Sequence, residues 1–327
     1  MFEFFHEPKF DFVGKTKIWA GVSIAMVVLA VAVLSTKGLH KGIEFTGGTE
    51  VQVQYASKPD IGAVRAILER SGFTGAVVTS IGKAEENEVY IRVPLAEGSA
   101  ERDISKEIVT ALQRDGAQLA LRGQSYIGPV IGEEIVTKAM WAIFGSLAGM
   151  LVYIWIRFEF QWGAAAVIAL VHDTIVTLGM FSLFDFEMSL PVVAAFLTLI
   201  GYSVNDTVVV FDRVRENIKL RGGELPTLRV LINDSLNQTL SRTMLTSSLT
   251  WICCLSLFFL GGPALRDFSI VLVMGIVIGT YSSIYVASPV LVAWREWISR
   301  RATEGGKTGA AAPAKPAARK VRTSGKA

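Results

Sequence analysis

Cysteine and charged residues are scarce in this sequence, and their scarcity excludes several classes of protein. Only two cysteines occur among the 327 residues, Cys253 and Cys254, which are adjacent in an apolar run. Adjacent cysteines lack the spacing of a metal site and cannot build a disulfide framework. Charged residues make up 19% of the chain and hydrophobic residues 51%, a balance that favours a membrane protein over a soluble one.

Signatures of soluble enzymes are also missing. The sequence has no Walker A loop, no GxGxxG after a predicted strand and no HExxH pair. Of its three histidines, only His172 lies in an apolar run after the first. We therefore expect no enzymatic activity, no bound cofactor and no metal site.

Six apolar runs have the length of membrane spans, which need about 17–25 residues. The first run follows seventeen mostly polar residues with no cleavage site after it, so we interpret it as a retained anchor. The other five runs are closely spaced, and about a hundred polar residues separate them from the first. The predicted spans are 18–35, 139–156, 163–184, 190–211, 244–260 and 268–294.

Basic residues in the short flanking segments predict the orientation of the chain. Three lysines lie within 1–17, Arg157 follows the second span, and six lysines and arginines lie within 212–243. The segment Asp185–Ser189 has none. Because basic segments stay on the cytoplasmic side, we expect both termini and the loop 212–243 to be cytoplasmic and the domain 36–138 to be periplasmic.

The C-terminal tail, 295–327, is rich in alanine, proline, lysine and glycine. With almost no large apolar residues it cannot bury enough surface to fold, so we expect it to be disordered. Its positive charge suits anionic lipid or ribosomal RNA, and it suits a plain solubilising tail equally well.

The domain between the first two spans alternates strand and helix patterns. Residues 51–55 alternate in polarity as a strand does, 61–68 carry an apolar helical stripe, and 76–81 and 89–93 read as two strands. A second helical stripe within 101–114 and a strand over 118–127 complete the series. The order β-α-β-β-α-β predicts a ferredoxin-like α+β module.

Two aspartates lie inside predicted spans, Asp173 in the third and Asp206 in the fourth. Inserting a carboxylate near the bilayer centre costs about 3 kcal/mol, so we treat such residues as candidates for a functional role. Helix rise places Asp173 near mid-membrane and Asp206 one to two turns nearer the cytoplasm, at a similar depth to Arg242. The sequence therefore predicts a buried Asp206–Arg242 ion pair that protonation of the aspartate would weaken.

A purely structural interpretation of these residues remains open. A buried Asp–Arg pair can simply lock a bundle together, and Asp173 can serve only to orient His172. Two GxxxG pairs permit close helix packing without implying function. They are Gly145/Gly149 and Gly275/Gly279.

Six strings stand out in or near the predicted spans. They are GIEFTGGT at 42–49, IGPVIGEE at 127–134, GYSVNDT at 201–207, FDRVREN at 211–217, SRT at 241–243 and GTYSSIYVASP at 279–289. Together with the arrangement of one span and then five, they resemble the SecF family of bacterial protein-export subunits, which belongs to the RND type of transporter. The resemblance covers about residues 10–295, and its one departure is Glu44, where the family more often has aspartate.

The resemblance implies a function and a set of partners. It implies half of a twelve-helix assembly in the inner membrane, formed with a SecD-like subunit and associated with the SecYEG channel and YajC. It also implies that proton flow helps to pull preproteins outward, with Asp206 and Arg242 in proton conduction. We add Asn205, from the same Asn-Asp-Thr string, and Asp173 as further proton-coupling candidates. Membrane lipid is a further expected partner, and nucleic acid is not.

Two other functions remain open from the sequence. The chain can be half of an RND-type exporter of lipids or small molecules that shares the intramembrane aspartate. It can also be a scaffold of the export channel that carries no protons.

Overall fold

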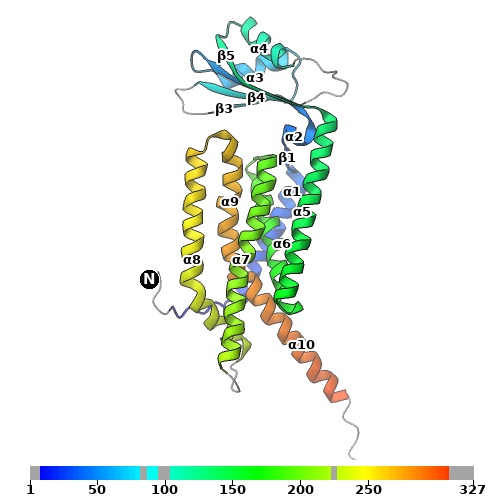
Figure 1. Ribbon diagram of the computed structural model, residues 1–327, viewed down its shortest axis with the longest axis vertical. Coiled ribbons are helices and arrows are strands. Elements are labelled where there is room, and N and C mark those ends of the chain that lie inside the picture. The colour runs from blue at the N-terminus through cyan, green and yellow to red at the C-terminus, as the bar shows by residue number, and fades with distance from the viewer. Residues whose placement is uncertain (1–7, 82–86, 95–103, 222–226, 309–327) are drawn as a thin grey trace, which may run out of the picture.

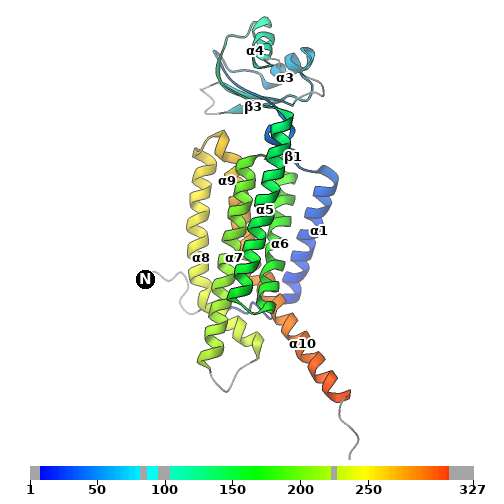
Figure 2. The same ribbon diagram turned by 45° about the vertical axis from the view of Figure 1, so that its right-hand side comes forward.

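The structure is a bundle of long helices with a small α+β domain at one end (Figure 1). It is a computed structural model that describes residues 8–81, 87–94, 104–221 and 227–308. The described N-terminal segment and helix α10 lie at the other end of the bundle (Figures 1 and 2). Within these described residues, six helical segments are long and apolar enough to cross a membrane, which confirms the predicted polytopic class.

The first five spanning segments are single helices, and the sixth is a helix interrupted by one turn of π-helix. Each contains at least about 20 residues, the number needed to cross a bilayer. They are α1 (Thr16–Lys37), α5 (Pro129–Arg157), α6 (Phe160–Leu183), α7 (Leu190–Leu220), α8 (Leu228–Leu260) and α9 (Pro263–Ser282), which continues through η1 (Ser283–Ala287) into α10 (Ser288–Thr308).

Several boundaries differ from those predicted by hydropathy. Helix α5 already begins at Pro129, ten residues before the predicted start of the second span at 139. The predicted loop 212–243 is largely helical, because α7 runs on to Leu220 and α8 already begins at Leu228. The two helices hold each other there: Asn217 donates to Ser235 at 2.8 Å, and Arg221 pairs with Asp234 at 2.9 Å. The predicted tail likewise starts as helix up to Thr308, and the rest of the expected disorder lies outside the described residues.

Three of the spanning segments form the interior of the bundle. In an apolar stretch of 18 residues within each segment, half or more of the residues are buried in α6 (56%), α7 (50%) and α9–α10 (67%). The corresponding shares are only 11% in α1, 6% in α5 and 17% in α8. Helix α9 packs against α6, α7 and α8. A polar side chain on α6, α7 or α9 is therefore placed to be shielded from both lipid and water.

Glycine brings α9 unusually close to α7. A Cβ atom at Gly279 would lie 3.1 Å from the Cβ of Ser203, and one at Gly275 would overlap the side chain of Leu199. The other GxxxG pair, Gly145/Gly149, faces open space in this chain. Only the α9 pair therefore serves close helix packing within the described bundle.

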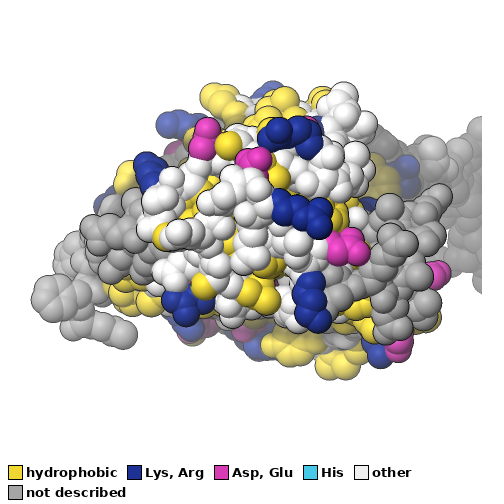
Figure 3. Space-filling model, turned by 90° about the horizontal axis from the view of Figure 1, so that it is seen from above, with side chains coloured by type: hydrophobic (Ala, Val, Ile, Leu, Met, Phe, Trp, Pro, Cys, Tyr) yellow, Lys and Arg dark blue, Asp and Glu magenta, His cyan; other side chains and the backbone are white. Residues whose placement is uncertain are grey.

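The α+β domain has the predicted ferredoxin-like order, which is confirmed. In the described part of the domain, four strands form one antiparallel sheet in the order β3-β4-β2-β5. Seen from above, the domain mixes basic, acidic and hydrophobic side chains instead of showing one uniform patch (Figure 3). Its elements are β2 (Gly48–Tyr55), α3 (Ile61–Arg70), β3 (Val77–Ile81), β4 (Glu88–Pro94), α4 (Ile104–Arg114) and β5 (Leu119–Ile127).

Alternation along the strands builds the core of this domain. Val51 and Val53 of β2 point to the same face, where they pack with the buried stripe of the two helices. Asp60 starts α3 by accepting a hydrogen bond from the backbone N–H of Gly62 at 2.8 Å. The helix stripes that cover the sheet are Val64 and Leu68 of α3 and Ile108 and Leu112 of α4.

Short elements connect the domain to the bundle. The strands β1 (His40–Lys41) and β6 (Glu187–Met188) pair in parallel, and the short helix α2 (Ile43–Thr46) leads into β2. Gly47 follows α2 with φ of +72°, a conformation that glycine adopts without strain.

Candidate functional site

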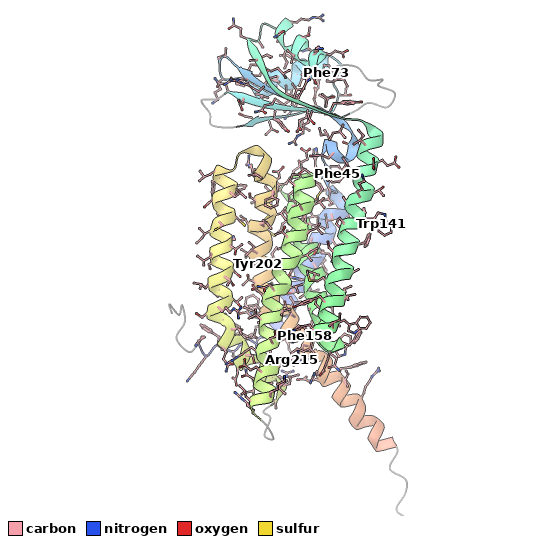
Figure 4. All side chains as sticks on the ribbon, viewed as in Figure 1. Phe45, Phe73, Trp141, Phe158, Tyr202 and Arg215 are labelled. Carbon is pink, nitrogen blue, oxygen red and sulfur yellow. The ribbon has the colours of Figure 1, made fainter. Side chains whose placement is uncertain are left out.

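Asp206 lies in the buried interior of the bundle, on α7. Its residue is 2% exposed, and its position is about 24 Å along the helix axis from Leu190. Its Oδ2 accepts a hydrogen bond from the hydroxyl of Ser247 on α8 at 3.1 Å. Tyr202, one turn earlier on α7 (Figure 4), reaches the same hydroxyl at 3.4 Å.

A chain of hydroxyl groups continues from Asp206 into α9. The Oγ1 of Thr280 lies 2.9 Å from the Oγ of Ser247 and 2.8 Å from the backbone oxygen of Ile276. A threonine hydroxyl has one hydrogen, so Thr280 can donate to only one of these two oxygens at a time. Three helices therefore meet in a hydrogen-bonded chain that has two possible directions.

The two directions correspond to the two charge states of Asp206. When the carboxylate is ionised, Thr280 donates to Ser247 and Ser247 donates to Asp206. When Asp206 carries a proton, it donates to Ser247, Ser247 donates to Thr280, and Thr280 donates to the oxygen of Ile276. The distances from Ser247 to Asp206 and to Thr280 suit either donor, and the oxygen of Ile276 accepts only, so a proton on Oδ2 of Asp206 is compatible with the reversed chain.

Asp173 is the second buried carboxylate, and it does not share hydrogen-bond partners with Asp206. It is 1% exposed on α6, ten residues or about 15 Å from the end of that helix at Leu183. Its Oδ2 accepts from Ser203 of α7 at 2.5 Å and from Ser282 of α9 at 2.6 Å. Its Oδ1 lies 2.9 Å from the Nδ1 of His172.

The predicted ion pair between Asp206 and Arg242 is not formed in this structure. No ion pair within 4.0 Å joins them among the described residues, although the two charges lie close enough to interact electrostatically. Thr243 and Ser247, four residues apart on α8, face inward, whereas Arg242 is exposed, because adjacent residues on a helix point about 100° apart. The similar depth of Asp206 and Arg242 along the bundle therefore did not imply that their side chains point toward each other.

Asn205 is also directed away from Asp206. It is exposed on α7, while Asp206 and the adjacent Thr207 are buried. The predicted coupling residues thus separate into two buried carboxylates and two exposed side chains on the outer surface of the bundle.

Four hydroxyl residues of these sites were not predicted from the sequence. Serine and threonine are common in spanning helices, so their presence alone carries little signal. The inward spacing of Thr243 and Ser247 and the run of hydroxyl residues after Gly279 were the available hints. The residues missed are Ser203, Ser247, Thr280 and Ser282.

Basic side chains gather at the end of the bundle opposite the α+β domain, where Figure 4 shows Arg215 beside Phe158. The guanidinium of Arg215 lies 5.6 Å from the centre of that ring. Ion pairs there tie α5 to α7, the α5–α6 connection to α10, and α8 to α10. They are Arg157–Asp212 (2.8 Å), Arg295–Glu159 (2.9 Å) and Arg229–Glu296 (2.6 Å).

Metal binding has no evident place in the part of the chain that the structure describes. There, no group of three or more histidine, cysteine, aspartate or glutamate side chains is arranged to hold an ion.

The fold and the two carboxylates define a polytopic membrane protein in which buried acids link the central helices beneath an α+β domain. Residues 107–297 match the family model of the protein export membrane protein SecD/SecF, C-terminal. Residues 32–58 match the SecD/SecF GG motif. The chain belongs to the SecD/SecF family.

Two related proteins and one solved structure agree with this assignment. The protein translocase subunit SecF of Desulfurispirillum indicum is 42% identical over 84% of this chain and 88% of its own length. The protein translocase subunit SecDF of Thermus thermophilus is 39% identical over 92% of this chain, which spans only 40% of that protein. The crystal structure of SecDF from that organism, a translocon-associated membrane protein, superposes with a TM-score of 0.78 at 37% identity, over 89% of this chain and 39% of that one.

Proposed function

We propose that this chain is the SecF-type subunit of a protein-export complex in the bacterial inner membrane, where it uses the proton gradient to draw preproteins outward. The observation that carries the proposal is Asp206, a buried acid whose hydroxyl chain joins α7, α8 and α9. In this proposal the chain performs no covalent catalysis and needs no bound cofactor, because the proton gradient supplies the energy.

A SecD-type subunit is the first partner of this assembly. Support comes from the Thermus thermophilus relative, a single chain named SecDF of which this chain matches less than half. The largely unburied faces of α1, α5 and α8 offer surface for another set of helices. The SecYEG channel, YajC and the preprotein are the further partners that we propose, by analogy with the family.

The orientation that we propose places the α+β domain in the periplasm and both termini in the cytoplasm. It rests on the basic side chains gathered at the opposite end of the bundle, since lysine and arginine are retained on the cytoplasmic side. In this orientation β3 and β5, the edge strands of the sheet, face the compartment that receives the preprotein. We propose that an extended preprotein segment pairs with one of these edges.

Proton binding at Asp206 is coupled to movement through the hydroxyl chain. The proton changes which groups donate to Ser247 and Thr280, and so it changes the contacts of α9 with α7 and α8. One charge that crosses 100 mV releases about 2.3 kcal/mol, enough to shift a two-state equilibrium about fiftyfold. We propose that Arg242 approaches Asp206 in another state of this cycle and that Asn205 acts at the outer surface.

The test uses the chain reconstituted in lipid vesicles with its SecD-type partner and the export channel. Asp206→Asn keeps the size of the side chain but cannot exchange a proton. Proton uptake and outward translocation should both fall at least about tenfold, at the low end of what positioned proton-transfer groups contribute, while the complex still assembles. Asp212→Asn, which removes a half-exposed carboxylate two turns later on the same helix, is the matched control.

The outcome separates three functions. Normal proton uptake and export in Asp206→Asn would refute the proposal. Loss of assembly in that variant would indicate a scaffold, and intact export with impaired efflux of a small molecule would indicate an exporter.

A further inference from the structure

His172 is a buried histidine with one unused nitrogen. The residue lies on α6 and is 6% exposed. Its Nδ1 faces the Oδ1 of Asp173 at 2.9 Å, while its Nε2 has no hydrogen-bond partner among the described residues. A buried polar atom without a partner is uncommon and calls for a specific explanation.

Three hydrogen-bonding groups surround the carboxyl group of Asp173. The hydroxyls of Ser203 and Ser282 contact its Oδ2, and Nδ1 of His172 contacts its Oδ1. All three can donate, His172 when its proton is on Nδ1, and three donors suit an ionised carboxylate. A single negative charge buried in this interior is costly unless a positive charge accompanies it.

Among the described residues, no lysine or arginine lies close enough to Asp173 to serve as its counter-charge. No ion pair within 4.0 Å joins Asp173 to either type of residue in the described part of the chain. The titratable groups packed nearby are Tyr281 at the end of α9, whose ring centre is 6.2 Å from that of His172, and Tyr285 of η1, which packs on Tyr281. The facing side of α1 offers Ser23, which bonds the hydroxyl of Tyr281 at 2.8 Å, and Asp206 lies one turn beyond Ser203 on α7.

We propose that His172 and Asp173 form a second proton-binding site, separate from Asp206, in which the proton is taken up at Nε2 of His172. With Nδ1–H directed at Asp173, the neutral imidazole keeps its lone pair on Nε2. Binding of a proton there gives an imidazolium that neutralises the adjacent carboxylate, and its release leaves the couple with one negative charge. Asp173 holds the ring in this tautomer, so it acts as a positioning residue.

The state of this couple is transmitted to α9 by Ser282. The hydroxyl of Ser282 lies 2.6 Å from Asp173 and 3.1 Å from the backbone oxygen of Gly279, and its one hydrogen can serve only one of them. A more negative couple draws the hydroxyl to Asp173, and a neutral couple frees it for its own helix. Ser282 is the last residue before the π-helical turn η1, and such turns are frequent at functional sites.

This inference rests on the proposed proton-coupled function, but its direct test does not. The chain contains three histidines, so His6→Gln and His40→Gln leave His172 as the only one. The full chain, labelled with ¹⁵N-histidine and assembled in lipid vesicles with an unlabelled SecD-type partner, would be followed by NMR from pH 5 to 9. Nε2 should change from the protonated to the unprotonated form as the pH rises, and should also do so in Asp206→Asn.

A second measurement tests whether this proton matters. His172→Asn retains an N–H that can reach Asp173 but has no site for an added proton. Proton uptake should fall at least about tenfold in the reconstituted complex, the lower range for a positioned proton-transfer group, while assembly is retained. His172→Gln, whose amide can also bond a neighbouring group but binds no proton, should show the same loss.

The outcomes distinguish this inference from the proposed function. If Nε2 stays in one form at every pH, or if His172→Asn takes up protons normally, the second site is refuted even where Asp206→Asn abolishes export. If His172 titrates and His172→Asn loses proton uptake while Asp206→Asn exports normally, the second site stands and the role of Asp206 falls.

Discussion

Replacing Glu187 with glutamine is expected to loosen the α+β domain from the helix bundle. Arg92 of β4 contacts Glu187, which lies in β6 between α6 and α7, and also pairs with Glu50 of β2 at 3.0 Å. Glu50 and Arg92 are opposite each other within the sheet, so their pair stays inside the domain. The Arg92–Glu187 pair instead crosses from the domain to the connection between two spanning helices.

The expected magnitude follows from the burial of this pair. Hydrogen bonds to charged groups contribute about 1.5–3 kcal/mol when buried, and fully exposed ion pairs contribute about 0–1 kcal/mol. The side chains of Arg92 and Glu187 are 24% and 13% exposed, which places them between these limits. A loss of about 1–2 kcal/mol corresponds to about a 5- to 30-fold rise in the population of the undocked domain.

Distances between spin labels would measure this population. Cys253 and Cys254 are first replaced by alanine, and labels are attached to new cysteines at two exposed positions, Gln113 on α4 and Ser256 on α8. Glu187→Gln should add a second, broader set of distances. Glu50→Gln, which removes the pair inside the domain, should leave the distances unchanged. The reasoning fails if the Glu187 variant matches the parent, or if both variants broaden the distances equally.

Two further substitutions test the connection below the domain and the packing of the bundle. Burial raises the pKa of Glu44, and the nearby charge of Glu50 adds to this effect. The folded chain therefore binds this proton more tightly than the unfolded chain, so ionised Glu44 costs stability above its folded-state pKa and the cost disappears as the pH falls. Glu44→Gln should raise the melting temperature at neutral pH and lose this advantage in acid, and an equal gain at both pH values in thermal unfolding would contradict the sign. At Gly179 a Cβ would lie 2.5 Å from the Cα of Ala30, so Gly179→Val should force α1 from α6 at a cost of about 1–3 kcal/mol. Gly201→Ala, where a Cβ meets nothing, is its control, and equal resistance of the two variants to unfolding in detergent would contradict this packing.

Local patterns were sufficient to predict most of the fold. The length of an apolar run and the alternation of a strand depend only on neighbouring residues, and both were confirmed in the six spans and the sheet. The ends of α7 and α8 were not predictable in this way. Their extensions beyond the apolar runs are stabilised by partners such as Arg221 with Asp234, which the fold brings together from separate helices.

In the candidate site, too, some residues were predictable from local sequence and their partners were not. Asp173 and Asp206 are visible in the sequence because an acid within an apolar run is a local signal. The predicted ion pair of Asp206 with Arg242 is not formed in this structure, because helix rise predicts depth alone, whereas contact also requires the side chains to point toward each other. Arg242 satisfies the first condition, and Ser247, five residues later on α8, satisfies both.

Helix α9 is connected by hydrogen bonds to both buried acids. Thr280 links it to Asp206 through Ser247, and Ser282 links it to Asp173. Each of these hydroxyls also has a backbone oxygen of α9 within reach, that of Ile276 for Thr280 and that of Gly279 for Ser282. A proton at Asp206, or one at His172 beside Asp173, therefore shifts a hydrogen bond from a neighbouring helix to α9 itself. Protons at both sites would leave α9 bonded mainly to its own backbone and free to slide along the glycine face that it presents to α7, with the π-helical turn as the place where the helix adjusts.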